Sequence, residues 1–143
     1  MPIKNYTTKV DVFTSVGEIQ GALARSGASK IMVDYKNGKP TAVTFAINTP
    51  NGIRGFSMPA AVEGTLRVFQ RQKVKAERDQ AERTAWRNIR DWVLAQVALV
   101  DSCDVPMEQV FLPYLTDNKG QTLYEAYTRG KLLPPESPQE EED

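Results

Sequence analysis

The first part of the chain alternates between apolar and polar residues, which predicts strands with one helix among them. The segment "YTTKVDVF", residues 6–13, alternates and is rich in β-branched residues, so we predict a first strand there. The segment "SVGEIQGALARSGA", residues 15–28, carries an apolar helical stripe instead. Ser15 and Glu18 have the spacing of a capping box, and Gly27 is a suitable left-handed terminator.

Residues 30–59 contain two Asn-Gly turn signals between three apolar runs, which predicts an antiparallel meander. The apolar positions of these runs are Ile31, Val33, Tyr35, Val43, Phe45, Ile47, Phe56 and Met58. A three-residue loop with Gly38 in the left-handed conformation keeps the first two runs on one face. At Asn51-Gly52 a two-residue turn serves instead, and it pairs Ile47 with Phe56 and Phe45 with Met58. Helices must then cover the single apolar face.

Two amphipathic helices follow, and their apolar stripes do not line up. The stripes are Val62, Leu66 and Phe69 in residues 59–72, and Trp86, Ile89, Val93, Val97 and Val100 in residues 76–102. On one continuous helix they differ in phase by roughly 140°. A single rod cannot turn both stripes toward one core. We therefore predict a break near residues 72–80, or else a second chain packed on one stripe.

Two shorter helices are predicted after these. Residues 104–113 form one, with Pro106 in its first turn. Residues 122–130 form the other, which opens with Thr122 and Glu125 at capping-box spacing.

Together the elements predict an α+β fold in a single domain, residues 1–133. Its sheet part covers about residues 5–59, and its helical part, about residues 60–130, covers one face of a small antiparallel meander. Residues 134–143 lack apolar periodicity and are expected to form a disordered acidic tail. The phase difference between the two helical stripes favours a homo-oligomer.

The composition argues against most catalytic and metal chemistry. The chain has no histidine, which removes the commonest general base and the commonest zinc ligand. The single cysteine, Cys103, cannot form an internal disulfide and fits a reducing compartment. We therefore predict a non-enzymatic protein with no catalytic residue, cofactor or metal. No apolar run approaches the ~18 residues of a bilayer span, and no signal-peptide stretch is present, which predicts a cytoplasmic protein with no membrane partner.

Positive charge is concentrated in residues 67–90, which hold eight Lys or Arg against three acids. The net charge of zero conceals this, because residues 134–143 hold five acids and no base. Clustered guanidinium groups offer forked, permanently charged donors that suit phosphate. The candidate residues for an anionic ligand are Arg67, Arg71, Lys75, Arg78, Arg83, Arg87 and Arg90. The alternative is an ordinary solvated helix face, on which Glu77, Asp79 and Glu82 offset the bases.

Aromatic residues give a second set of candidates. Trp86 lies on the apolar stripe and is expected in the core, whereas Trp92 lies at its edge and is a candidate for stacking or for an oligomer contact. Tyr114, Tyr124 and Tyr127 could line a pocket with Arg129, or could pack their part of the chain onto the sheet with their hydroxyls at the rim.

The segment "AWRNIRDWVLAQVALVDSCDVPMEQVFLPYL", with "YTT", "EIQ" and "TLYE", resembles a group of small proteins encoded by tailed phages and prophages. The resemblance covers about residues 5–128 and implies a phage origin and a place in the host cytoplasm, but no mechanism, because that family has no assigned activity. Our leading hypothesis is a phage accessory protein that binds nucleic acid or a nucleotide through the Arg-rich segment. The competing hypothesis is a host-directed counter-defence protein that sequesters a nucleotide signal or blocks a host immune protein.

Overall fold

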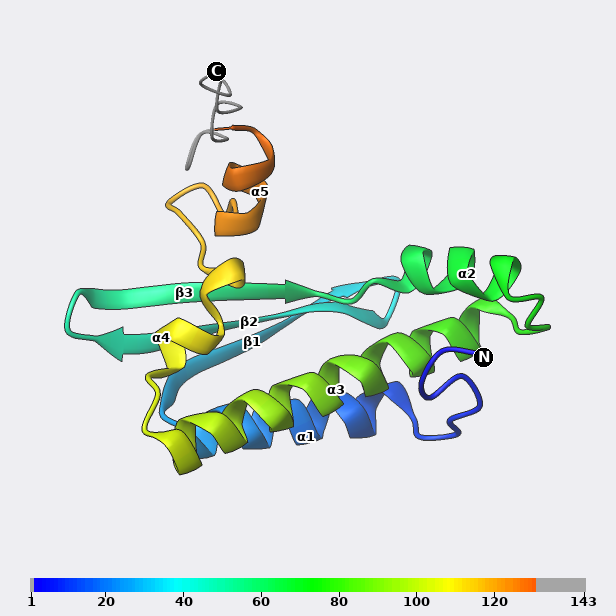
Figure 1. Ribbon diagram of the computed structural model, residues 1–143, viewed down its shortest axis with the longest axis horizontal. Coiled ribbons are helices and arrows are strands. Elements are labelled where there is room, and N and C mark those ends of the chain that lie inside the picture. Colours follow the sequence, from blue (N-terminus) through cyan, green and yellow to red (C-terminus); the bar gives the residue numbers. More distant parts are fainter. Residues whose placement is uncertain (1, 131–143) are drawn as a thin grey trace, which may run out of the picture.

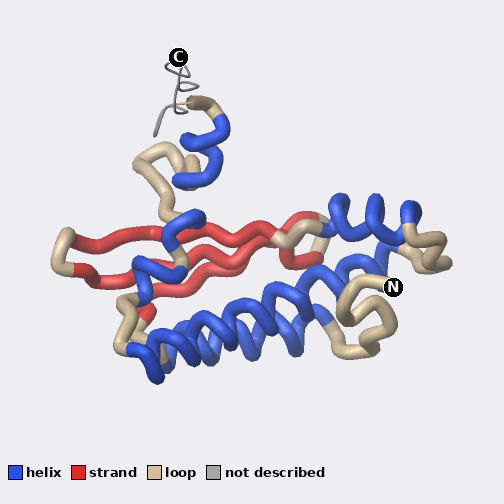
Figure 2. Tube along the Cα trace, viewed as in Figure 1, coloured by secondary structure: helices blue, strands red, loops and turns tan. Residues whose placement is uncertain are grey.

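A computed structural model describes residues 2–130, and it has the predicted α+β fold (Figures 1 and 2). Met1 and residues 131–143, on which the predicted disordered tail falls, lie outside the described residues. In chain order the elements are α1 (Val12–Arg25), β1 (Ala28–Lys36), β2 (Lys39–Thr49), β3 (Gly52–Pro59), α2 (Val62–Arg71), α3 (Arg78–Cys103), α4 (Met107–Val110), the 3-10 helix η1 (Leu112–Tyr114) and α5 (Leu123–Thr128).

The three strands form one antiparallel sheet in the order β1-β2-β3, and helices cover one of its faces. Figure 1 shows α1 and α3 side by side below the sheet, with α4 crossing in front of it. The core between these layers centres on Phe45, Phe56 and Phe111, of which Phe45 stacks on Phe56 with ring centroids 5.2 Å apart. Trp86 is fully buried, as predicted, and its indole N–H donates to the Pro40 carbonyl at 3.3 Å.

The predicted strand at residues 6–13 is wrong, because this segment is a loop that runs into α1. Its backbone is held by side chains of α3. The Gln80 amide donates to the carbonyls of Tyr6 and Thr8 at 3.0 and 2.9 Å, and just before the segment the Thr84 hydroxyl donates to the Asn5 carbonyl at 2.9 Å. Alternation alone did not reveal that polar helix side chains, instead of a strand, would satisfy these carbonyls.

The start of α1 also differs from the prediction. Asp11 is the N-cap, and its carboxylate accepts from the Phe13 N–H at 2.7 Å. The helix therefore begins one turn earlier than the Ser15 and Glu18 capping box implied. Ser15 is buried inside the helix, which frees Glu18 for a contact with α3.

The β1–β2 hairpin keeps both apolar runs on one face, as predicted, but it does so with a two-residue turn and a bulge instead of a three-residue loop. The turn is a two-residue one, with Asn37 and Gly38 both at positive φ (53° and 78°) and Lys36 opposite Lys39. A register shift between Asp34 and Tyr35 then inserts one extra β2 residue. This bulge restores the parity that the two-residue turn alone would lose.

The β2–β3 register is displaced by two residues from the predicted one. Thr49 lies opposite Gly52, so Phe45 faces Phe56 and Val43 faces Met58. The turn residues are thus Pro50 and Asn51, one position earlier than predicted. Because a shift of two residues preserves the side-chain face, the predicted single apolar face is confirmed.

The predicted break between the two long helices is confirmed, at residues 72–77. Phe69 of the first stripe and Trp86 and Val93 of the second are buried, each in its own helix. The break lets one chain bury both stripes, so their phase difference no longer argues for an oligomer. The capping box of Thr122 and Glu125 at the start of α5 is also present.

Two glycine substitutions are expected to change stability in opposite directions. Gly38→Ala forces a side chain into the left-handed conformation of the turn and should lower the free energy of unfolding by about 1 kcal/mol. Gly17 lies inside α1, where an added Cβ meets nothing within 4 Å, so Gly17→Ala should raise stability by about 0.5–1 kcal/mol. Urea unfolding followed by far-UV circular dichroism measures both. Destabilisation by both substitutions would contradict the assigned turn and helix.

Candidate functional site

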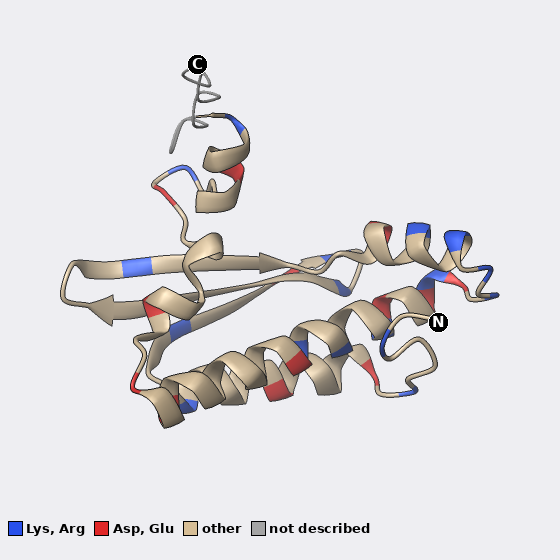
Figure 3. Ribbon diagram, in the orientation of Figure 1, with Lys and Arg blue, Asp and Glu red and all other residues tan. Residues whose placement is uncertain are grey.

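The predicted basic segment divides into two groups in the structure. Arg67, Arg71 and Lys75 are exposed on α2 and on the turn after it, whereas Arg83, Arg87 and Arg90 lie half-buried along α3. Figure 3 shows blue positions gathered at the end of the molecule where α2, the α2–α3 turn and the N-terminal loop meet. The two groups have different partners.

Arg87 and Arg90 hold α3 against α1. Both guanidinium groups donate to the same Glu18 carboxylate oxygen, each at 2.7 Å. Only 19% and 26% of their side chains is exposed. Burial acts to raise the pKa of Glu18, but the hydrogen bond from Arg90 and the charges of both arginines outweigh it and lower the pKa. These two residues therefore act inside the fold, and the expectation of an accessible Arg83–Arg87–Arg90 stripe is not met.

Asp91 ties the N-terminal loop to the same helix. Its carboxylate accepts from the Asn5 amide at 2.9 Å and pairs with Lys4 at 3.1 Å and with Arg90 at 3.0 Å. Burial acts to raise the pKa of Asp91, but hydrogen bonds from Asn5, Arg90 and Lys4 lower it to about 2.

Arg78 is also engaged, at the joint between α2 and α3. Its guanidinium pairs with Glu63 of α2 at 2.6 Å and with Glu82 at 3.4 Å. Glu82 is itself buried, and it receives a second ion pair from Lys39 at 3.2 Å. Arg78 therefore joins an exposed acid of α2 to a buried acid of α3 at this joint.

The exposed cations belong to a different environment. None of the ion pairs formed among residues 2–130 involves Lys9, Arg67, Arg71, Lys73 or Lys75. We call these five residues the basic end. Lys9 and Lys73 were not among the predicted site residues, because the link between the N-terminal loop and the turn depends on tertiary contacts.

Part of the basic end surrounds an open hollow of about 610 Å³ between the N-terminal loop and the α2–α3 turn. Its lining includes Lys9, Lys73, Lys75, Tyr6 and Arg83. Arg83 donates to the Gln80 amide oxygen at 2.6 Å, while its Nε is buried and has no partner among the described residues. A second open hollow, about 700 Å³, lies along the α2 flank that carries Arg67 and Arg71.

The turn is held in a defined shape by the end of α2. The Val74 N–H donates to the Phe69 carbonyl at 2.9 Å, and the Lys73 N–H donates to the Gln70 carbonyl at 3.3 Å. These are the two hydrogen bonds of a Schellman motif. Lys73 occupies the left-handed position, φ 56°, where glycine is usual. The turn thus carries a cation where a smaller residue would suit the backbone better.

The predicted aromatic candidates lie elsewhere. Trp92 is half-buried and packs edge-on against Phe111 and Tyr114. Tyr124 and Tyr127 of α5 are exposed and stack on each other with centroids 6.3 Å apart. A hollow of about 420 Å³ is lined by Tyr114 and Tyr124, but neither Tyr127 nor Arg129 lines it.

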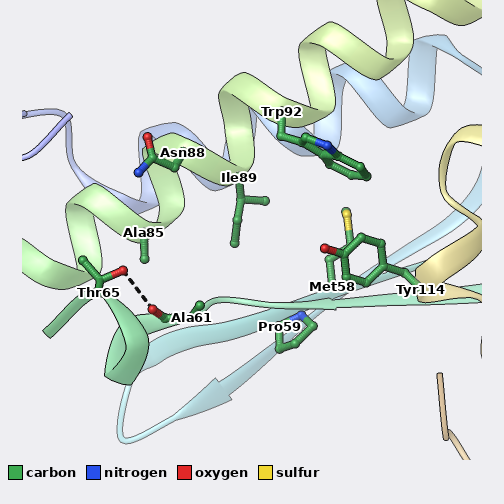
Figure 4. Close-up of a pocket in the computed structure, with 9 residues that line it drawn as sticks. All are labelled: Met58, Pro59, Ala61, Thr65, Ala85, Asn88, Ile89, Trp92 and Tyr114. Atoms are coloured by element: carbon green, nitrogen blue, oxygen red, sulfur yellow. Dashed lines mark hydrogen bonds between the residues drawn. The ribbon is translucent and has the colours of Figure 1, made fainter. Parts of the chain in front are cut away.

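A smaller cavity of about 340 Å³ lies between α2, α3 and β3 (Figure 4). Ile89 and Trp92 extend into it from α3, with Tyr114 at one end and Thr65 at the other. No charged side chain lines it.

Among residues 2–130, no group of three or more Cys, Asp or Glu side chains has the arrangement of a metal site. No helix in the same range is long and apolar enough to cross a membrane. Cys103 is exposed at the end of α3.

The ion pairs of Asp91 are expected to appear in the pH dependence of stability. Its folded-state pKa of about 2 is below the ordinary value of 3.8, so the unfolded chain binds the proton more readily. The resulting stability, about 2 kcal/mol, is present above about pH 4 and is lost as the pH falls toward 2. Urea unfolding at several pH values should show this decline, and Asp91→Asn should flatten it. An equal decline in both proteins would show that Asp91 is not the group responsible.

Comparison with protein-family models, with curated proteins and with solved structures gives no match. The resemblance to phage proteins therefore stays a prediction.

Proposed function

We propose that this protein binds nucleic acid, with the phosphate backbone lying across the basic end. The observation that carries the proposal is the gathering there of five cations that form no ion pair among residues 2–130. Such cations can each neutralise a phosphate without first breaking an internal contact, and the released counterions favour binding. The half-buried Arg83 also lines the hollow that Lys9, Lys73 and Lys75 surround.

The shape of this surface favours a polymer over a free nucleotide. Arg67 and Arg71 are one helical turn apart on one flank of α2, and Lys73 and Lys75 continue from the end of that helix. Both neighbouring hollows are open to solvent. A nucleotide-sequestering site would instead enclose most of its ligand. Exposed cations spread over two open hollows suit an extended phosphate backbone better than one compact ligand.

The left-handed Lys73 supports the same proposal. A residue other than glycine in this conformation costs on the order of 1 kcal/mol. Lys73→Gly would relieve that strain and remove a charge from the turn. A lysine at this position thus suits binding better than stability.

Tyr6 gives the surface one aromatic group. It lines the hollow next to the lysines and is 36% exposed. Aromatic side chains beside a basic track can stack on unpaired bases, which makes single strands the preferred form. The predicted alternative, a counter-defence inhibitor acting on a host protein or a nucleotide signal, rests on the phage resemblance alone and stays a prediction.

The proposal predicts a salt-dependent affinity that two arginines of α2 control. Fluorescence anisotropy with labelled single-stranded and duplex DNA and RNA should show binding that weakens as salt is raised. Arg67→Ala with Arg71→Ala should lower affinity by about tenfold or more, and should reduce the slope of log affinity against log salt by about 2. These residues are exposed, so the unfolding midpoint should not change.

A matched control removes two exposed cations elsewhere, Arg54 of β3 and Lys119 of the turn before α5. Arg54→Ala with Lys119→Ala changes the net charge equally and should leave both affinity and slope close to wild type. Equal weakening by the two double variants would mean that overall charge, and not the basic end, drives binding. Absence of salt-dependent binding to every probe would refute the proposal.

A further inference from the structure

The outer side of β1 is an open sheet edge. Among residues 2–130, β1 pairs only with β2. The opposite edge is partly covered, because Leu115 bridges Phe56 and the Thr116 N–H donates to the Gly55 carbonyl at 2.8 Å. In an antiparallel ladder every second residue of an edge strand directs its N–H and C=O groups outward. The edge of β1 is therefore a template for one more strand.

We propose that a second copy of the chain supplies that strand, through antiparallel pairing of β1 with β1 about a twofold axis at Met32. In this register Lys30 lies opposite Asp34 of the partner subunit, and the same pair repeats across the axis. Opposite charges facing each other on neighbouring strands are favourable. The contact is isologous, so it closes at two subunits and leaves no further β1 edge exposed.

The charges of β1 favour this register over those with the axis at Val33 or at Asp34, whereas an axis at Ile31 only removes the opposite-charge pair. An axis at Val33 places Lys30 opposite Lys36 of the partner subunit, and an axis at Asp34 places the two acids against each other. Both arrangements set like charges opposite each other, which is unfavourable. Neither Lys30 nor Asp34 takes part in an ion pair among residues 2–130, so both remain free to pair between subunits.

The apolar residues of β1 fit the same pairing. Met32 is 58% exposed, and pairing at the axis would bury it against Met32 of the partner subunit. On the helix-covered face, Ile31 comes opposite Val33 of the partner subunit. Both residues are only half-buried within one chain and pack at the margin of its core. The dimer would therefore join the two cores across one continuous sheet.

The geometry of β1 permits antiparallel pairing with β1 of a second chain. Its ladder with β2 is regular from Lys30 to Asp34, between two register shifts, and these are the residues that the proposed pairing uses. Charged residues on an edge strand often prevent association. In β1, however, Lys30 and Asp34 carry opposite signs and lie symmetrically about Met32, so self-pairing sets each opposite its counterion. The pattern therefore favours pairing with itself.

Charge reversal tests the register directly. Light scattering coupled to size-exclusion chromatography, without nucleic acid, should give twice the 16.0 kDa chain mass for the full chain as its concentration is raised. Lys30→Asp alone and Asp34→Lys alone should each raise the dimer dissociation constant by at least about tenfold, because both place like charges opposite each other. The double variant Lys30→Asp with Asp34→Lys should restore the dimer.

Mixing the two single variants gives the sharpest result. One then presents only acids and the other only lysines at positions 30 and 34, so the mixture should form a heterodimer when neither variant dimerises alone. Both substitutions are at exposed positions, and unchanged circular dichroism and urea midpoints would show that each variant is folded. A wild-type chain that stays monomeric throughout, or a dimer that both single variants retain, would overturn the proposal. The proposal would also be overturned if neither the double variant nor the mixture of single variants dimerised.

Discussion

The structure depends on the three strands presenting their apolar side chains to the same side of the sheet. Phe45 and Phe56 face each other there, and Phe111, Trp86 and α1 complete the core around them. A one-residue error in either hairpin would turn a whole strand over. The bulge in β2 prevents this at the first hairpin, where a two-residue turn alone would give the wrong parity. With one face apolar, α1 and α3 must lie together on it, and their contact then determines which charges remain available at the surface.

The contact between α1 and α3 engages some arginines in ion pairs within the fold and leaves other cations exposed. Arg87 and Arg90 are bound to Glu18 of α1, and Arg78 is engaged separately at the α2–α3 joint, so the sequence cluster is not one surface. The basic end is assembled instead from α2, the turn after it and the N-terminal loop. Its cations lie away from the uncharged cavity beside Trp92. The proposed nucleic-acid surface and the proposed β1 interface share no residues, so either can exist without the other.

Much of the fold was predictable from local patterns, whereas the site was less so. The single apolar face, the break after α2 and the Thr122 cap each follow from spacing within a few residues. The strand predicted at residues 6–13 failed because the carbonyls of Tyr6 and Thr8 bind Gln80, more than seventy residues away. Glu18 gave a usable signal, since it shares a helix face with the buried Ser15 and Ala22, where a charge needs a partner. Which arginines pair with Glu18 depends on how α3 packs against α1, and local sequence patterns do not determine that packing.

The N-terminal loop has a consequence for the order in which the chain folds. Its hydrogen bonds, and those of Glu18, join residues separated by 69 to 86 positions. The two hairpins close over short distances and can form early, but the first segment must wait until α3 has been synthesised. During synthesis, the apolar face of the sheet would have α1 as its only long helical cover until α3 leaves the ribosome.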